Sequence, residues 1–185
     1  MRLPHLVLPF LLTTLGCTGE APAPRVEWPL TCSPFPSGAD EIPACARRDA
    51  AGEIVLRPGV VAAQGGPHTV RVEGELLFAL ASGTTAPALP FDNGADYFVE
   101  GLARTIRDGK VGFVNEALEV VIPRQWDFAF PFENGLARVC SGCAVVRDPG
   151  DEHGSVEGGK WGWIDREGRV VVAVEHERDN LPSPK

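Results

Sequence analysis

The segment from Gly154 to Trp161 has the glycine and lysine spacing of a phosphate-binding loop. It runs Gly-Ser-Val-Glu-Gly-Gly-Lys before Trp161. Phosphate chemistry of this kind needs a Ser or Thr after the Lys to hold magnesium, and a helix that begins there and presents its amides. Trp161 fills that position, and strand-forming residues follow it. We therefore interpret the match as accidental and expect no cofactor.

Cys140 and Cys143 are the second candidate for chemistry, because two thiols at this spacing occur in redox pairs and metal sites. A redox pair works at a helix N-terminus, which lowers the thiol pKa, whereas this pair ends a strand-like segment. A zinc site needs four ligands, and the neighbouring donors are His153 and three acidic residues. We expect a structural disulfide here and no metal.

The remaining nucleophiles and bases do not form a set. Ser155 lies near His153 in a glycine-rich stretch, which offers no rigid scaffold for a nucleophile, a base and an orienting acid. The carboxylates Asp127 and Glu133 accompany a repeated phrase, which indicates a role in turns. We expect no catalytic residues and no enzymatic activity.

The charge balance argues against nucleic acid as a partner. The chain has 17 basic and 25 acidic residues, which give a formal net charge of −8. Such a surface repels phosphate backbones, and the sequence contains no basic cluster with interleaved aromatic residues.

The most informative pattern is a phrase that occurs twice. Gly-Leu-Ala-Arg is followed in each copy by Gly-Lys-x-Gly-aromatic-aliphatic. Self-similarity of this kind predicts stacked copies of one supersecondary unit. The repeated positions are Gly101, Leu102, Ala103, Gly109, Lys110, Gly112 and Phe113 in one copy, and Gly135, Leu136, Ala137, Gly159, Lys160, Trp161, Gly162 and Trp163 in the other.

Turn residues place these phrases on β-hairpins. Asp108-Gly109 separates two apolar-rich segments, 102–107 and 110–114, and is a strong hairpin signal. Residues 165–168 predict a second turn, followed by a β-branched strand. A degenerate copy covers 72–79, with Leu77 where Gly112 stands in the next copy, and 52–56 resembles the last strand of a still earlier unit.

Together these phrases resemble the bacterial WG-repeat family over about residues 66–174. Leu118 departs from the pattern, because Gly168 stands at that place in the following copy. The resemblance implies an all-β fold in which antiparallel β-hairpin repeats stack as a short solenoid-like array, with a partial propeller or a β-sandwich as alternatives. It also implies an interaction or envelope module whose repeat motif carries no catalytic role.

The N-terminus predicts export. Arg2, an apolar run and small residues before Cys17 are typical of a helical signal peptide over residues 1–16. Leu15-Gly16-Cys17 resembles the lipobox of bacterial lipoproteins, which implies lipidation of Cys17 and a membrane-anchored protein. Thr18 resembles the residue found in lipoproteins sorted to the outer membrane. The alternative is an ordinary secretory signal with an incidental Cys.

The other four cysteines agree with an oxidising compartment. The simplest pairing is local, Cys32 with Cys45 and Cys140 with Cys143, although the other two pairings remain open. We expect residues 17–45 to form a proline-rich tether, residues 46–176 the repeat domain with an insertion at 141–158, and residues 177–185 a disordered tail.

The function predicted on these grounds is that of a non-catalytic interaction or structural module of the cell envelope, facing the periplasm or the cell surface, with a protein partner. The insertion is the segment we expect to carry specificity, because a long hairpin loop is usually functional or disordered. The alternative is a glycan- or peptidoglycan-binding module that uses exposed aromatic residues, of which Trp28 and Trp126 are the least constrained. An envelope hydrolase is the least favoured alternative.

Overall fold

The computed structural model describes residues 26–35, 40–147 and 154–184. The predicted signal peptide and Cys17 lie outside these residues. None of the described helices is long and apolar enough to cross a membrane. The strands are β1 (Leu30–Pro34), β2 (Ile42–Arg48), β3 (Ile54–Leu56), β4 (His68–Val72), β5 (Glu75–Ala79), β6 (Thr85–Pro87), β7 (Pro90–Phe91), β8 (Gly94–Ala95), β9 (Leu102–Arg107), β10 (Lys110–Asn115), β11 (Val120–Trp126), β12 (Phe128–Ala129), β13 (Leu136–Val146), β14 (Ser155–Asp165) and β15 (Val170–His176), and a single 3-10 turn, η1 (Arg178–Asn180), follows them.

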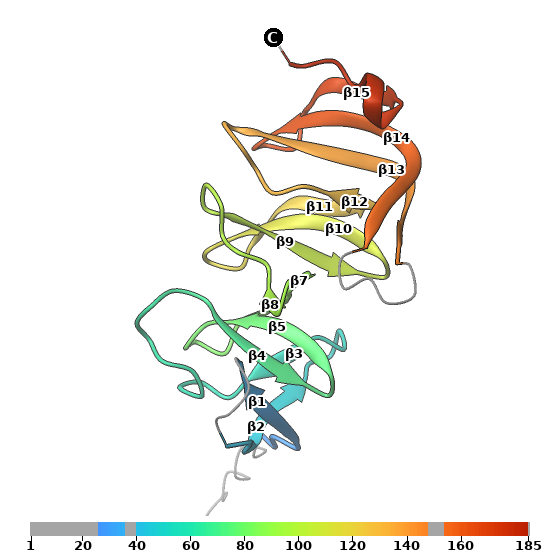
Figure 1. The fold of residues 1–185 in the computed structure, drawn as a ribbon. Coiled ribbons are helices and arrows are strands. Elements are labelled where there is room, and N and C mark those ends of the chain that lie inside the picture. Colours follow the sequence, from blue (N-terminus) through green and yellow to red (C-terminus); the bar gives the residue numbers. More distant parts are fainter. Residues whose placement is uncertain (1–25, 36–39, 148–153, 185) are drawn as a thin grey trace, which may run out of the picture.

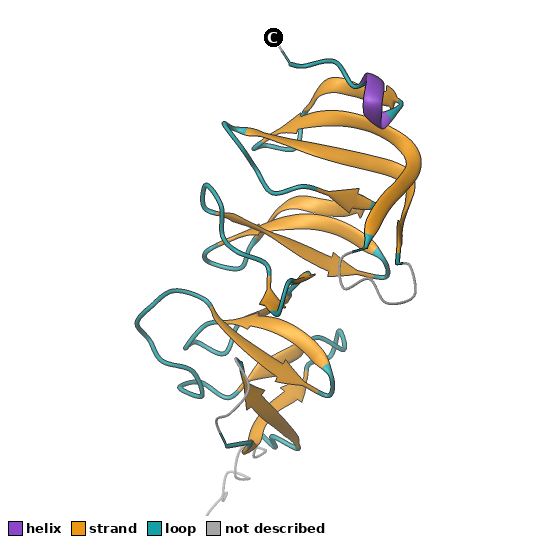
Figure 2. Cartoon of the chain, in the orientation of Figure 1, coloured by secondary structure: helices purple, strands orange, loops and turns teal. Residues whose placement is uncertain are grey.

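The strands form three layers that stack in chain order (Figure 1). The first layer is a six-stranded sheet in the order β3-β2-β1-β4-β5-β6, the second contains β9, β10 and β11, and the third contains β12 to β15. The short β7–β8 hairpin lies between the first two layers. All the strand pairs are antiparallel, so the predicted all-β array of stacked hairpins is confirmed (Figure 2).

The first layer curls into a nearly closed barrel, which the sequence did not predict. Its two edge strands meet, because the Leu56 amide donates to the Gly83 carbonyl at 2.9 Å and the Thr85 hydroxyl donates to the Ile54 carbonyl. The barrel encloses one apolar cluster of buried side chains, which includes Cys32, Leu56 and Val70.

The expected tether reaches less far than residue 45. β1 and β2 pair within the barrel, and Cys32 and Cys45 are fully buried at its centre. Pro34 stands at the end of β1, and the Pro43 side chain is exposed on β2, so neither proline prevents pairing. The proline-rich composition therefore obscured two strands that contribute Cys32, Cys45 and Ala46 to a core.

Each repeat is a three-stranded meander with the same second turn. The meanders are β1–β2–β3, β4–β5–β6, β9–β10–β11 and β13–β14–β15. In every copy the residue that opens the turn exchanges backbone hydrogen bonds with residues three and four positions later. The Oδ1 atoms of Asp49, Asn115 and Asp165 also accept two backbone N–H groups each, which is the usual role of Asp and Asn in turns.

The fourth position of this turn has positive φ, which explains its glycine preference. Gly52, Gly83 and Gly168 have φ of 82°, 96° and 80°, whereas Leu118 adopts φ of 62° in the second layer. A Cβ at Gly168 would lie 3.3 Å from the Ile122 side chain of the layer before it. Leu118 is instead buried in one cluster with Ala86 and Ala88. The large turn residue is thus part of an interlayer cluster that includes several alanines, whereas the small turn residue lies close to Ile122.

Two apolar clusters join the layers. One contains Leu76 and Phe78 of the barrel with Ala103, Val114 and Leu118 of the second layer. The other joins the second and third layers, and its largest members are Phe113, Phe132, Ile122 and Ile164. The second layer is therefore covered on both faces, as expected for the interior unit of a repeat stack.

The structure places the C-terminal segment through residue 184 against β14, whereas the sequence predicted a disordered tail over residues 177–185. The Trp163 Nε1 donates to the Pro182 carbonyl at 3.0 Å. The Arg178 guanidinium lies 5.7 Å from the ring centroid of Trp161 and donates to the Val156 carbonyl at 3.0 Å. This segment lies over β14 at the open end of the stack, where a further repeat would otherwise pack.

Candidate binding surfaces

The Gly-Leu-Ala phrase begins at a tight turn. Gly101 and Gly135 have φ of 78° and 79°, and each follows a residue that also has positive φ, Glu100 or Asn134. Successive copies contact each other, because the Glu100 carboxylate accepts the Gly135 amide at 3.0 Å. The Leu and Ala that follow pack into the interlayer clusters, apart from Leu136, which is half-buried at the end of the stack.

The lysine of each Gly-Lys-x-Gly core forms an ion pair at the end of the third strand. Lys110 Nζ lies 2.5 Å from Asp127 Oδ1, and Lys160 Nζ lies 2.5 Å from Glu177 Oε1. Both partners lie 17 residues after their lysine, a repeated spacing from which the pairs could have been predicted. Each lysine is thus held in an ion pair of the fold, which agrees with the interpretation that the match to a phosphate-binding loop is accidental.

The second glycine of the core accommodates a bulge. A Cβ at Gly112 would lie 2.8 Å from the Arg124 nitrogen and would also meet the Ile122 carbonyl. A Cβ at Gly162 would lie 2.9 Å from Val174 Cα. The register with the third strand shifts in both units. It does not shift between β5 and β6, where Leu77 replaces the glycine.

The arginine of the phrase has a different partner in each copy. Arg104 and Asp96 form a buried ion pair with an NH2–Oδ1 distance of 2.6 Å, and both side chains are 2% exposed. The same arginine donates to the Ala129 carbonyl at 3.0 Å. Arg138 lies instead over the Phe130 ring, 4.1 Å from its centroid. These contacts bind the linking segments to the layers.

Several aromatic residues of the repeats belong to the core. Phe113, Phe132 and Trp161 are almost fully buried, and the rings of Phe113 and Phe132 lie 4.8 Å apart. Trp28 and Trp126, the residues expected to be least constrained, are both half-buried. The strongly exposed aromatic side chains are Tyr97 (63%) and Phe91 (45%).

The cysteines pair locally, as the sequence favours. Cys32 and Cys45 form one disulfide with a Cα–Cα distance of 5.9 Å, and Cys140 and Cys143 form the other at 6.1 Å. Across the described residues, no three His, Cys, Asp or Glu side chains come together in a way that could hold a metal ion.

The insertion is mainly a long hairpin, not the loop that the sequence suggested. β13 and β14 have 11 residues each and pair from Leu136↔Asp165 to Val146↔Ser155. Gly142, Gly158 and Gly159 all have positive φ, and the ribbon bends beyond this point toward the second layer (Figure 1). Asp127 Oδ2 accepts the Gly142 amide at 2.7 Å. Val145 and Val146 on the bent part are 53% and 39% exposed.

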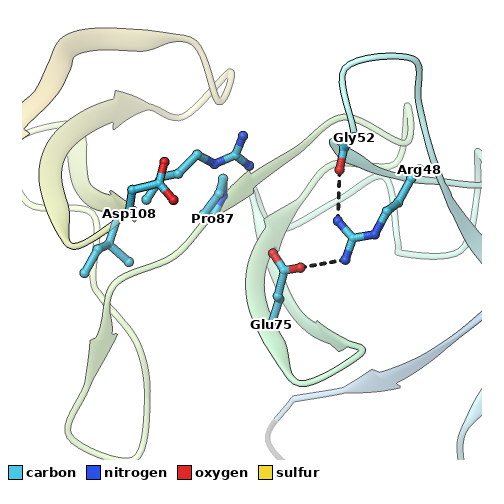
Figure 3. Close-up of a pocket in the computed structure, with 7 residues that line it drawn as sticks. Arg48, Gly52, Glu75, Pro87 and Asp108 are labelled. Atoms are coloured by element: carbon cyan, nitrogen blue, oxygen red, sulfur yellow. Dashed lines mark hydrogen bonds and ion pairs between the residues drawn. The ribbon is translucent and has the colours of Figure 1, made fainter.

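A polar pocket lies between the barrel and the second layer (Figure 3). Arg48 donates to the Gly52 carbonyl at 2.9 Å and to the Glu75 carboxylate at 2.7 Å. Hydrogen bonds to Glu75 and Glu73 raise the pKa of Arg48. Arg107 pairs with Glu53. Because both arginines that line the pocket are neutralised by carboxylates, it offers no free cation to an anionic ligand.

A second pocket, of about 460 Å³, lies between the barrel and the β7–β8 hairpin and is rich in aromatic side chains. The residues that line it are Phe35, Pro67, Thr69, Phe78, Asp92, Asn93, Gly94, Ala95, Asp96, Tyr97 and Phe98. Residues 92–98 of this lining belong to the segment that connects β6 to β9. The sequence signal for them is Asp96-Tyr97, which stands where the segment before β13 has Phe130-Pro131.

A model of the WG containing repeat matches residues 112–142. The matched segment begins within β10 and ends within β13, so it contains the third strand of one unit and the linking segment that leads into the next. The match supports a WG-repeat family, in agreement with the repeated phrases. The comparison with curated proteins gave no match, and the comparison with solved structures gave none either.

Proposed function

We propose that the protein is an exported, lipid-anchored module of the cell envelope that binds another protein and performs no chemistry. Its support comes first from the N-terminal pattern that ends at Cys17. Two disulfides in a chain of this size are typical of oxidising compartments. The repeat-motif residues are used for turns, bulges, ion pairs and core packing, so they support the fold itself.

The β13–β14 hairpin is the observation that carries the proposal. It is the one repeat hairpin that extends well beyond its layer among the described residues, and its extension exposes Val145 and Val146. An exposed apolar pair on a projecting, disulfide-braced hairpin suits contact with a partner protein better than it suits an isolated surface.

Site-specific photo-crosslinking in cells that produce the full chain tests the partner proposal. We expect a photo-reactive residue at Val145 to give one discrete protein adduct. The same residue at Val121, which is 37% exposed on β11, serves as the control and should give none. Equal adducts at both positions, or no adduct at Val145, would show that the hairpin is not the binding surface.

Metabolic labelling with a lipid precursor tests the anchor separately. The unmodified chain should incorporate label and sediment with membranes, and Cys17→Ala should do neither. Labelling that persists in Cys17→Ala would contradict lipidation at this residue.

A further inference from the structure

The pocket beside the β7–β8 hairpin combines features that the repeat fold does not require. The hairpin interrupts the connection between β6 and β9, whereas the corresponding connection before β13 contains only β12. Phe98 packs against the barrel residue Phe78 with ring centroids 5.0 Å apart. Gly94 lies against Phe35 so closely that a Cβ there would be 3.0 Å from the ring. The aromatic floor is therefore held in place from both sides.

Tyr97 stands at the edge of this floor and is exposed to solvent. Its side chain is among the most exposed large apolar groups of the described residues, at 63%. Its ring meets the Phe91 ring edge-on at a centroid distance of 6.1 Å. An aromatic ring held in this way loses little conformational freedom when a ligand stacks on it, which favours binding.

Polar groups at the hairpin tip complete the pocket. Asp92 and Asn93 are exposed, and their side chains make no hydrogen bond to the part of the chain that the structure describes. They provide carboxylate and amide oxygens as acceptors and an amide NH₂ as donor. Asp96, by contrast, is occupied by Arg104. The lining therefore combines aromatic rings with donors and acceptors that make no hydrogen bond within the described residues.

The chemistry of the lining selects among ligand classes. Among the described residues that line the pocket there is no Lys, Arg or His, so phosphates, nucleotides and other anions would find no counter-charge among them and would be repelled by Asp92. A wholly apolar ligand would form no hydrogen bond with Asp92 or Asn93, so it would use only the aromatic part of the lining. A ligand with an apolar face and a rim of neutral hydroxyl groups satisfies both sides.

We propose that this pocket binds a neutral saccharide, with a sugar ring stacked on Tyr97 and its hydroxyl or acetamido groups hydrogen-bonded to Asp92 and Asn93. The Asp92 carboxylate can accept from two adjacent hydroxyls, and Asn93 can both donate and accept. This site goes beyond the proposed function, does not depend on it and lies on a different part of the molecule from the β13–β14 hairpin.

Isothermal titration calorimetry on the full chain tests the site. The probes are chitotetraose, cellotetraose and maltotetraose, which separate N-acetylated, β-linked and α-linked sugars. We expect at least one to bind at millimolar or lower concentration. Tyr97→Ala should weaken that binding about tenfold, which is the loss of one stacking contact. Asp92→Asn and Asn93→Ala should each weaken it as well, because the first replaces one of two carboxylate acceptors by an amide donor and the second removes the side-chain amide.

Two controls keep a folding defect from being mistaken for a lost site. Tyr97→Phe retains the ring and should retain most of the affinity. Val121→Ala changes an exposed residue of β11 that does not line the pocket and should leave the affinity unchanged. Thermal melting should be the same for all variants, because the substituted side chains are exposed. Absence of heat with all three oligosaccharides, or equal binding by Tyr97→Ala and the unmodified chain, would overturn the proposal.

Discussion

Gly112 and Gly162 show why a motif that contains glycine and lysine can be structural. Each glycine leaves space where the third strand shifts register and its backbone comes close. The β4–β5–β6 unit confirms the relation in reverse, since Leu77 occurs where β5 and β6 pair without a shift. The glycine of the motif is therefore explained by the local backbone geometry, in which the third strand comes close.

This relation predicts different costs for two neighbouring glycines. Gly112→Ala should destabilise the protein by about 3 kcal/mol, because its Cβ would meet backbone atoms that cannot move aside. A Cβ at Gly109 would meet no atom within 4 Å. Gly109→Ala should therefore cost only the backbone strain of an alanine at φ of 72°, which is about 1 kcal/mol. Urea denaturation at neutral pH measures both. Equal losses would mean that the bulge yields easily to the methyl group.

Asp127 links Lys110 of the second layer to the long β13–β14 hairpin. This link makes part of the stability of the fold pH-dependent. Hydrogen bonds from Lys110 and from the Gly142 amide lower the pKa of Asp127. A carboxylate whose pKa is lower in the folded state stabilises the fold above its unfolded pKa of about 4. That stabilisation is lost as the pH falls through the folded pKa.

The expected outcome is that Asp127→Asn melts at a lower temperature than the unmodified chain at pH 7, and that the difference shrinks in acid. Thermal melts at pH 7 and at about pH 3 measure it. Asp108→Asn is the matched control, because Asp108 is an exposed turn residue without an ion pair in the described part of the chain. A difference that stays constant with pH would argue against a charge effect.

Only some of these ion-pair partners could be predicted from the sequence. The 17-residue spacing of the Lys–acid pairs repeats and could have been recognised. The Arg104–Asp96 pair could not, because Phe130 stands at the position of Asp96 in the next copy. The arginine of the repeated phrase thus has a partner at this position in both copies, but the partner is a carboxylate in one copy and an aromatic ring in the other.

At the scale of elements, turns were predicted well and the ends of the domain were not. Asp108-Gly109 and the turn that ends at Gly168 are local, since their conformations follow from the residues in them. β1 and β2 depend on burial inside a barrel formed with β4, which no local pattern shows. The insertion similarly extends two strands because each satisfies the backbone of the other.

The C-terminal segment is an element whose removal has a measurable effect. Deletion of residues 178–185 keeps the Lys160–Glu177 pair but removes the Pro182 carbonyl and Arg178 from the two tryptophans. We expect acrylamide to quench tryptophan fluorescence more strongly, and stability to fall by about 1 kcal/mol for the lost hydrogen bond. Deletion of residues 183–185 retains both contacts and should change neither. Unchanged quenching after the longer deletion would show that the segment does not cover the rings.

At the scale of the whole molecule, the three layers differ in how they are covered. The second layer has apolar clusters on both faces, whereas the third ends in β15, an edge strand with Val170 and Val171 about half exposed. Local opening requires less free energy where fewer apolar contacts are broken. Stability should therefore be graded along the stack.

Native-state hydrogen exchange measures this gradient. Amides of β10 should open only with global unfolding, and amides of β15 should open at a lower free energy. β4 and β5 in the barrel provide the internal reference for a disulfide-braced layer. Equal opening free energies in β10 and β15 would show that the stack behaves as one cooperative unit.

The packing of Leu118 in the cluster with Ala86 and Ala88, and the closeness of Gly168 to Ile122, have a consequence for how the chain assembles. Chains of similar repeats are prone to pair the wrong copies during folding. Here the two interfaces differ in the size of their turn residue, since a side chain at position 168 would press on Ile122 and Gly at position 118 would remove a buried side chain from its cluster. The sequence differences between the copies thus make each layer fit its own neighbour best. This favours the observed order of the stack and disfavours exchange of hairpins between molecules.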